Sequence, residues 1–342
     1  MEPQYRMQTK RIRPFVQSAK VSNRGCSIAL QRVVTDFGAD EAFAQAMDKL
    51  VEHYGIILGE STIRRITEGH ARKIFETALR PATPSKPRPG SAAQIIVEMD
   101  GGMVPIMEPD ATQNDQRKGK NLLWKEAKIC LAHAAGSKSP SYGGTLQGDV
   151  DTAGAKLLAC ANSAGFDRKT YVHGVGDGAP WIAGQVEDQF GSQGHYLLDF
   201  FHVCEYLSAA GKAIHTEAAS RDAWIDEQKV RLKTGQSKAF LQGLLPHLEE
   251  AQVEDADAPV RQCHRYLSNR PEQLDYQGAA ARELPIGSGE IESAHRYIVQ
   301  QRLKLPGAWW RAANAEHMLA LRLNRANEQW GAYWADHSKL AA

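Results

Sequence analysis

The segment PATPSKPRPGS, at positions 81–91, divides the sequence into two parts that differ in hydrophobic periodicity. Its four prolines lock φ and remove backbone donors, so we predict an extended linker there and not a helix. Before it, apolar residues recur every three or four positions, which is typical of helices. After it, short apolar runs separated by glycines are typical of strands. The pattern predicts a helical domain at 1–80, the linker, and an α/β domain beyond it.

The composition of the 342-residue chain is typical of a globular, intracellular protein. With 42% hydrophobic and 24% charged residues, disorder of the whole chain is excluded. No apolar run approaches the ~20 residues of a membrane helix, and the basic N-terminus has no signal-peptide core. The five cysteines are scattered, which favours buried thiols over disulfides or zinc knuckles. We expect a cytoplasmic protein with no membrane partner.

Two helices are predicted before the linker. The first, DEAFAQAMDKLVEHYG, is amphipathic and stops at Gly55. The second, TIRRITEGHARKIFETAL, follows a short turn and the N-cap Ser61. Its apolar arc consists of Ile63, Ile66, His70 and Ile74. Its opposite side carries Arg64, Arg65 and Arg72. This pattern favours a helix-turn-helix-like unit whose arginines contact DNA, although a helical pair with a solvated charged face would look the same.

The net charge of +1 is unevenly distributed. Residues 1–90 carry 15 Lys/Arg and 9 Asp/Glu, and residues 291–342 carry 7 and 4, so both ends are basic. The centre is acidic. Such a distribution fits flanks that bind a polyanion around a centre that holds cations, and it also fits an ordinary solvated surface.

After the linker the elements are predicted in the order β-β-β-α-β-α-β. The strands are QIIVEM at 94–99, MVPIM at 103–107, WKEAKICLAHA at 124–134, YVHGV at 171–175 and HYLLD at 195–199, with helices near 150–164 and 180–190. The first domain part therefore spans 92–199. An all-α insertion is predicted at 200–284, and C-terminal helices at 285–342 complete the domain, the first of them capped by Ser288.

Three acidic residues stand where this topology could bring them together. Asp100 ends the first strand, Asp177 follows the fourth, and Glu292 lies in the first turn of a late helix. Asp199 is the alternative candidate for the second acid, and Glu290 is the alternative candidate for the third. Carboxylates are the ligands that Mg²⁺ and Mn²⁺ prefer, and two such ions could catalyse phosphodiester displacement. This order of elements is that of ribonuclease-H-like nucleases and transposases. The same sequence would arise without a metal site if Asp100 and Asp177 were turn residues and Glu292 were an acid that stabilises the helix dipole at a helix start.

Glycines flank the first two acids. Gly101 and Gly102 follow Asp100, and they are expected to leave room for a phosphate or a metal. The string GVGDGA at 174–179 also matches the GxGxxA dinucleotide fingerprint, with Asp199 at the end of the next strand. Against a dinucleotide, the charge of Asp177 would repel the pyrophosphate.

Several weaker candidates are better explained by core packing. His202 with Cys204, and Cys263 with His264, could hold zinc, but no second ligand pair has suitable spacing. Trp309 and Trp310 could stack on an unpaired base.

The strings GDGAPWI, LLDFFHVCEYL and LPIGSGEIESAHRYIVQQRLK, followed by LPGAWW and NEQWGAYW, resemble bacterial insertion-sequence transposases of the ISKra group and, more distantly, Mutator-like acidic-triad transposases. The resemblance spans about residues 27–334. It implies a ribonuclease-H-like catalytic domain with a helical insertion and a divalent-metal triad. Asp100, Asp177 and Glu292 match the three carboxylates. Many longer relatives carry a cysteine-bearing N-terminal segment, and here the one nearby cysteine is Cys26.

We therefore predict a DNA transposase that binds the terminal repeats of its element, cleaves them with two Mg²⁺ or Mn²⁺ ions and joins them to target DNA. Its partners would be double-stranded DNA and further copies of the chain, in the nucleoid of a bacterium. The alternatives are a transposase-derived DNA-binding protein without catalysis and a dinucleotide-dependent oxidoreductase.

Overall fold

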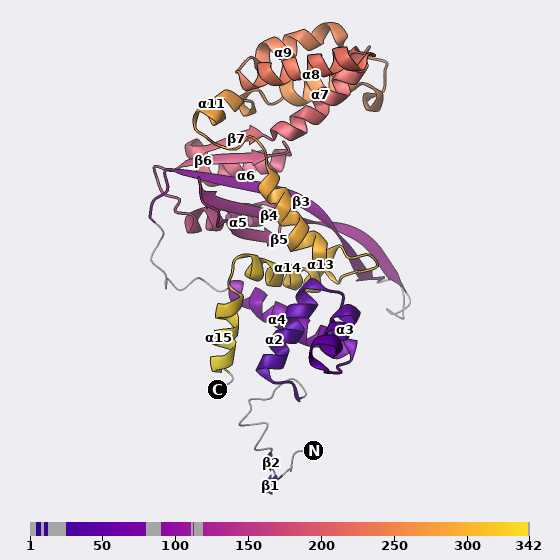
Figure 1. Ribbon diagram of the computed structural model, residues 1–342, viewed down its shortest axis with the longest axis vertical. Helices are drawn as coiled ribbons and strands as arrows, with labels where there is room; N and C mark the ends of the chain where they lie inside the picture. The colour runs from indigo at the N-terminus through magenta and orange to yellow at the C-terminus, as the bar shows by residue number, and fades with distance from the viewer. Residues whose placement is uncertain are drawn as a thin grey trace.

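The computed structural model describes residues 5–7, 10–12, 25–79, 90–110, 112 and 119–340, so most of the predicted linker lies outside the described residues. The chain is an α/β protein in which N-terminal helices precede a five-stranded mixed sheet, and many helices follow the sheet (Figure 1). A short antiparallel pair, β1 (Tyr5–Met7) and β2 (Lys10–Ile12), lies near the N-terminus. Among the helices of the described residues, none has the length and apolar character of a membrane span.

The sheet has the order β5-β4-β3-β6-β7. Its strands are β3 (Gln94–Pro109), β4 (Lys120–Ala134), β5 (Ser141–Thr145), β6 (Tyr171–Gly176) and β7 (Gly194–Leu198). The first three strands are antiparallel neighbours, and β6 and β7 run parallel to β3. Two helices make the crossovers, α5 (Val150–Ser163) and α6 (Pro180–Phe190). The predicted order β-β-β-α-β-α-β is therefore confirmed.

The identity of the first three strands was predicted wrongly. The runs 94–99 and 103–107 belong to one strand, β3, because Gly101 and Gly102 stay extended and pair with Lys128 and Ala127 of β4. Asp100 accordingly lies inside a strand and not at its end. The third strand is β5, whose sequence SYGGT has few of the branched apolar residues that indicate a strand.

The two faces of β3 bury different helices, because successive side chains of a strand point to opposite sides. Ile95, Val97 and Met99 pack with residues of α5 and α6. Val104 and Ile106, on the other face, pack with the C-terminal helices. Glu98 and Asp100 share the parity of this second face, so they lie on the side of the sheet that the C-terminal helices cover.

The described part of the N-terminal region includes the helices α2 (Ile28–Asp40), α3 (Phe43–Tyr54) and α4 (Glu60–Ala78). The second ends at Gly55, which has a left-handed φ of 62°, as predicted. The third is capped by Gly59 and already includes Ser61, so the predicted N-cap was wrong by two residues. Ile63, Ile66, His70 and Ile74 are buried, which confirms the predicted apolar arc.

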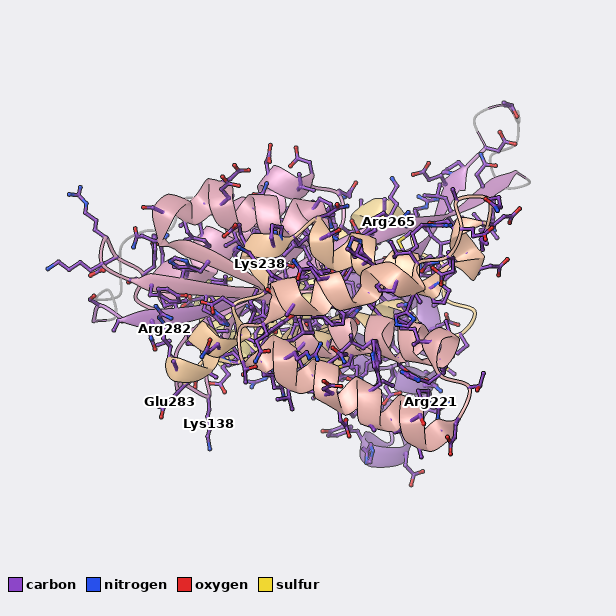
Figure 2. The ribbon with its side chains drawn as sticks, turned by 90° about the horizontal axis from the view of Figure 1, so that it is seen from above. Lys138, Arg221, Lys238, Arg265, Arg282 and Glu283 are labelled. Atoms are coloured by element: carbon purple, nitrogen blue, oxygen red, sulfur yellow. The ribbon has the colours of Figure 1, made fainter. Side chains whose placement is uncertain are left out.

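The segment between β7 and the C-terminal helices is helical, and we call it the insertion. Its helices are α7 (Phe200–Ile214), α8 (Ala218–Lys233), α9 (Ser237–Leu244), α10 (Pro259–Ser268) and α11 (Tyr276–Ala281). They form the end of the molecule opposite the N-terminal helices (Figure 1). Figure 2 views the molecule from this end and shows Arg221, Lys238 and Arg265 on its outer surface. Leu197 and Leu198 of β7 join its hydrophobic core.

After the insertion the chain returns across the sheet as one continuous helical run. It consists of α12 (Gly289–Ala294), the π-helical η6 (His295–Gln300) and α13 (Gln301–Leu303), and it starts after Ser288 as predicted. Two more helices follow, α14 (Ala312–Ala326) and α15 (Trp330–Leu340). The run lies diagonally over the sheet, and α14 lies between the sheet and the N-terminal helices (Figure 1).

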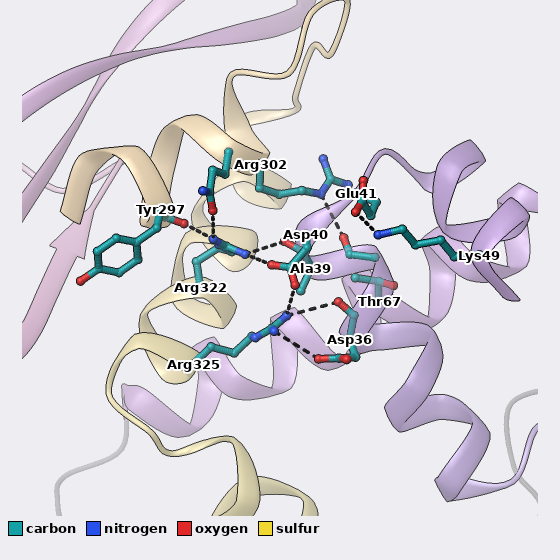
Figure 3. Close-up of polar contacts among 12 residues, drawn as sticks. Asp36, Ala39, Asp40, Glu41, Lys49, Thr67, Tyr297, Arg302, Arg322 and Arg325 are labelled. Atoms are coloured by element: carbon teal, nitrogen blue, oxygen red, sulfur yellow. Dashed lines mark hydrogen bonds and ion pairs between the residues drawn. The ribbon is translucent and has the colours of Figure 1, made fainter. Parts of the chain in front are cut away.

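Three arginines connect these C-terminal helices to α2, and we call this group the arginine clasp: Arg302, Arg322 and Arg325 (Figure 3). Arg302 donates to the carbonyl of Gly38, at 3.0 Å, and Arg322 donates to that of Ala39, at 3.2 Å. Arg325 pairs with Asp36 and Asp40. The last carbonyls of a helix lack intrahelical partners and carry the negative end of its dipole, so α2 offers a natural site for cations.

Candidate functional site

Asp100 and Asp177 lie side by side at the edge of the sheet where β6 stops. The pairing of β3 with β6 ends at Glu98 and Val175, so Asp100 projects just beyond its parallel neighbour. Asp177 directly follows the last residue of β6. The negative charge of Asp177 contributes to raising the pKa of Asp100, which reflects their proximity.

The carboxyl of Asp100 is half-buried and incompletely balanced. Burial raises its pKa, and the charges of Asp177 and Glu126 raise it further. The imidazole of His295, whose Nε2 is 3.4 Å from Oδ2, and the Gly101 N–H, 2.7 Å from Oδ1, act in the opposite direction. Because the pKa is raised overall, these two groups do not offset the unfavourable terms, and a cation at this position would do so.

Glu292 is exposed on the first helical turn of the C-terminal run, and among the described residues it forms no common group of potential metal ligands with Asp100 and Asp177. Its carboxylate, the carboxylate of Asp199 and the imidazole of His202 each offer a ligand atom, and these atoms lie within 4.8 Å of one another. Such a group of oxygen and nitrogen donors has the chemistry of a metal site. The predicted third acid is therefore next to the predicted substitute for the second.

Asp199 is fixed by its hydrogen bonds. It follows β7 and caps α7, where Oδ1 accepts from the backbone N–H of Phe201 at 2.6 Å. Oδ2 accepts from the backbone N–H of Ser288 at 2.7 Å and from its hydroxyl. Ser288 thus connects the start of α12 to the end of β7. The ends of β6 and β7 are also joined, because the Asp199 N–H donates to the Gly176 carbonyl at 2.7 Å.

Glu98 belongs to the same acidic region, although the sequence analysis missed it. It is 2% exposed, and its Oε2 accepts from the backbone N–H of Ile291 at 2.8 Å. Burial raises the pKa of Glu98 to about 8, and the charges of Glu290, Asp199 and Glu292 contribute. The signal was available, because positions 98 and 100 lie on one face of a strand.

The other predicted substitute, Glu290, has a different partner. Its Oε2 lies 3.0 Å from Nε2 of His133 on β4, and its side chain is half exposed. Glu290 and Glu292 therefore contact different groups, His133 in one case and the pair Asp199 and His202 in the other.

The glycines beside Asp100 do not leave open space for a phosphate or a metal, contrary to the prediction. A Cβ at Gly101 would lie 2.2 Å from Oε1 of Glu126, and a Cβ at Gly102 would lie 2.8 Å from Cε1 and Nδ1 of His295. The space is filled by side chains of the protein.

The turn after β6 does not favour a dinucleotide. The N–H of Gly178 donates to the hydroxyl of Tyr196 at 3.1 Å, and the N–H of Ala179 donates to the carboxylate of Asp177 at 2.9 Å. A pyrophosphate needs such backbone donors, and here protein groups already accept from them.

A cleft of about 1110 Å³ lies between β7 and the insertion, lined by residues that include Tyr171, His195 and Arg270. None of the three predicted acids lines it. Glu292 is on the exposed surface instead, which suits a reaction on a macromolecule better than one on an enclosed small molecule.

The predicted DNA-binding arginines differ in exposure. Arg64 and Arg72 are exposed on α4, and Arg72 lies 3.6 Å from Glu76. Arg65 is half-buried with its Nη2 atom inside, so it does not share the exposed face that the helical wheel predicted.

The fold places the weaker candidates from the sequence in different environments. Cys263 is fully buried in the core of the insertion, where burial raises the pKa of its thiol to about 12, so it is a poor zinc ligand. Trp310 is buried and donates to the carbonyl of Leu303, whereas Trp309 is 40% exposed. All five cysteines are free thiols, and all of them except the partly exposed Cys204 are buried as predicted.

Comparison with models of known protein families finds no match, and comparison with curated proteins finds no significant similarity.

Proposed function

We propose that the protein is a DNA transposase, and that Asp100, Asp177 and Glu292 form its metal-binding triad on a ribonuclease-H-like core. The observation that carries the proposal is the position of Asp100. It lies beside the end of β6, next to Asp177, and contacts the helical run that bears Glu292.

The topology supports the ribonuclease-H-like assignment. Numbered from β3, the strand order is 3-2-1-4-5, with three antiparallel strands followed by two parallel ones. The acids come from the first strand, from the end of the fourth, and from a helix after the fifth, which is the order that the sequence motifs imply.

The residues of the site fit a divalent cation. Asp100 is disfavoured in its ionised form by burial and by two neighbouring carboxylates, and a bound cation would reverse that effect. In the proposed site Asp100, Asp177 and Glu292 would hold the ions. When bound, the ions activate an attacking hydroxyl and stabilise the leaving oxygen of a phosphodiester.

The remaining residues position the acids and the DNA. The Gly101 N–H holds one oxygen of Asp100, and the exposed position of Glu292 leaves it accessible to a DNA strand. Arg64 and Arg72 on α4 supply cations for phosphate contacts with the ends of the element. One phosphodiester bond breaks as another forms, so joining requires no ATP. Two ends must be held together, which requires at least two copies of the chain.

A cleavage assay tests the proposal. The full chain, with Mg²⁺ or Mn²⁺ and DNA that contains the sequences flanking its reading frame, is expected to cut or join strands. Asp100→Asn should abolish cleavage and leave DNA binding in a mobility-shift assay unchanged. The matched control is Asp110→Asn, because Asp110 follows the same strand and is partly exposed, outside the acidic region.

Cleavage that survives Asp100→Asn would remove Asp100 from the site. DNA binding by a wild-type chain that never cuts would favour the transposase-derived DNA-binding protein instead.

A further inference from the structure

We propose that His295 is a positioning residue for Asp100, and that Gly102 lacks a side chain because the imidazole of His295 occupies its place. This inference rests on the proposed function, because it concerns how the chain orients the first carboxylate for metal binding.

His295 is buried and directed at Asp100. Its side chain is 5% exposed, and its Nε2 lies 3.4 Å from Oδ2 of Asp100. This nitrogen is buried and forms no hydrogen bond of good geometry with any described residue. A buried N–H without a partner is unfavourable. A small rotation of the Asp100 carboxyl would bring Oδ2 into hydrogen-bonding distance.

Asp100 would then be held at both oxygens. Oδ1 already accepts from the Gly101 N–H at 2.7 Å, and His295 would donate to Oδ2. Each carboxylate oxygen has a second lone pair, which would remain for an ion. A carboxylate that bridges two ions needs a fixed orientation, and hydrogen bonds from neighbouring residues commonly provide it.

The helix that carries His295 has an irregular geometry at this position. The π-helical turn begins at His295, immediately after α12 ends at Ala294. Such turns insert an extra residue into a helix and are frequent at functional sites. Glu292 and His295 are three residues apart, so they lie on one side of the run, where Glu292 faces Asp199 and His295 faces Asp100.

The two glycines of β3 provide a matched pair of probes. A methyl at Gly102 would lie 2.8 Å from two atoms of the imidazole ring, which is rigid and buried. A methyl at Gly101, on the other face of the strand, would meet the carboxylate end of Glu126, a flexible side chain that is 38% exposed. Gly102→Ala should therefore displace the imidazole, whereas Gly101→Ala should displace Glu126, whose charge also acts on Asp100.

The test is calorimetric titration of Mn²⁺ into the full chain without DNA. We expect His295→Ala and Gly102→Ala to weaken Mn²⁺ binding about 10- to 100-fold, the range found when a group that orients a metal ligand is removed. His295→Gln retains an N–H donor and should recover most of the lost affinity. Asp110→Asn, which lies beyond the end of β3 and outside the acidic region, should stay within about twofold of the wild type. In cleavage assays His295→Ala should lower kcat and leave the KM for DNA unchanged.

The double variant makes the steric argument falsifiable even if Gly102→Ala folds poorly. With His295 already replaced by Ala, the added methyl has room, so Gly102→Ala should cause no further loss of affinity. An equal loss in both backgrounds would overturn the inference.

The outcome separates the two proposals. Wild-type protein that binds no Mn²⁺, or Asp100→Asn protein that binds it normally, contradicts the proposed function. Loss of binding in Asp100→Asn together with normal binding in His295→Ala contradicts only the role of His295.

Discussion

The acidic edge of the sheet, which comprises Glu98, Asp100, Asp177, Asp199 and Glu292, can be compared with the arginine clasp. Both groups are partly buried and highly charged, but their charges are balanced differently. In the clasp, burial lowers the pKa of Arg302 to about 10 and that of Arg322 as well, but each arginine has a carboxylate or carbonyl partner on α2. At the sheet edge, acids outnumber the groups that could neutralise them, and the pKa values of Glu98 and Asp100 are raised. A balanced network is explained by folding alone. The unbalanced one is where we propose that a cation binds.

The largest effect is expected at the acidic edge. Asp177→Asn should reduce strand cleavage by at least about 10³-fold, because it would remove a ligand of the proposed metal site. The same change should raise the thermal midpoint of the metal-free protein, because it removes one charge from a repulsive cluster. Cleavage and melting are measured on the same preparation.

Asp110→Asn is the control for both measurements. If Asp177→Asn lowered the melting temperature, the acidic edge would not be repulsive, and the contrast with the clasp would be lost.

The clasp should respond in the opposite way. Arg302 is 2% exposed, donates to Gly38 and lies 4.6 Å above the ring of Phe43. We expect Arg302→Met to destabilise the protein by about 2–4 kcal/mol, because the α2 carbonyl loses its charged donor and the cation–π contacts disappear. Urea unfolding measures the change.

Arg72→Met is the comparison for the clasp, since this arginine is exposed and its ion pair with Glu76 should contribute less than about 1 kcal/mol. Equal effects of the two variants would show that the burial of Arg302 contributes nothing.

The pH dependence of stability tests the packing of the N-terminal helices against the C-terminal helices. His70 is buried between Gln31 and Tyr333, and burial lowers its pKa to about 3 from 6.5. The unfolded chain therefore binds a proton that the folded chain excludes, and stability should fall as the pH drops below about 6.5. The slope from this group is at most about 1.4 kcal/mol per pH unit. Unfolding of His70→Gln between pH 4 and pH 7 should give a shallower curve, and an unchanged curve would exclude His70 as its cause.

The smallest effect is expected on the surface of α4. Arg64→Gln should weaken DNA binding several-fold and lower the salt slope by about one, because one phosphate contact is lost. Lys238→Gln, on the far end of the molecule, should leave both unchanged (Figure 2). Equal losses from both variants would mean that binding follows total charge and not the face of α4.

The sheet was predictable because strands and helices alternate strongly after position 92. The exceptions have a physical cause. Gly101 and Gly102 suggested a break, yet glycine remains extended where a partner strand continues, as β4 does. The strand β5 was missed because its pairing with β4, and not its composition, defines it.

The candidate site was predictable only in part. Acidic residues at the ends of predicted strands and at the starts of predicted helices can be recognised from the sequence by their positions. His295 does not, because its importance depends on which strand residue faces it, and a sequence contains that information only through the parity of β3 and the phase of the helix. Arg65 shows the same limit, since its half-buried position depends on how α4 packs in the folded chain.

The helical run from Gly289 to Leu303 begins beside the acids and ends at Arg302, which is anchored to α2. It therefore connects the acidic residues at the sheet to the N-terminal helices. In a transposase built this way, the number of base pairs between the recognised sequence and the scissile bond would be fixed by the length of that helical run, as with a ruler. An element with a shifted recognition sequence would be bound and left uncut.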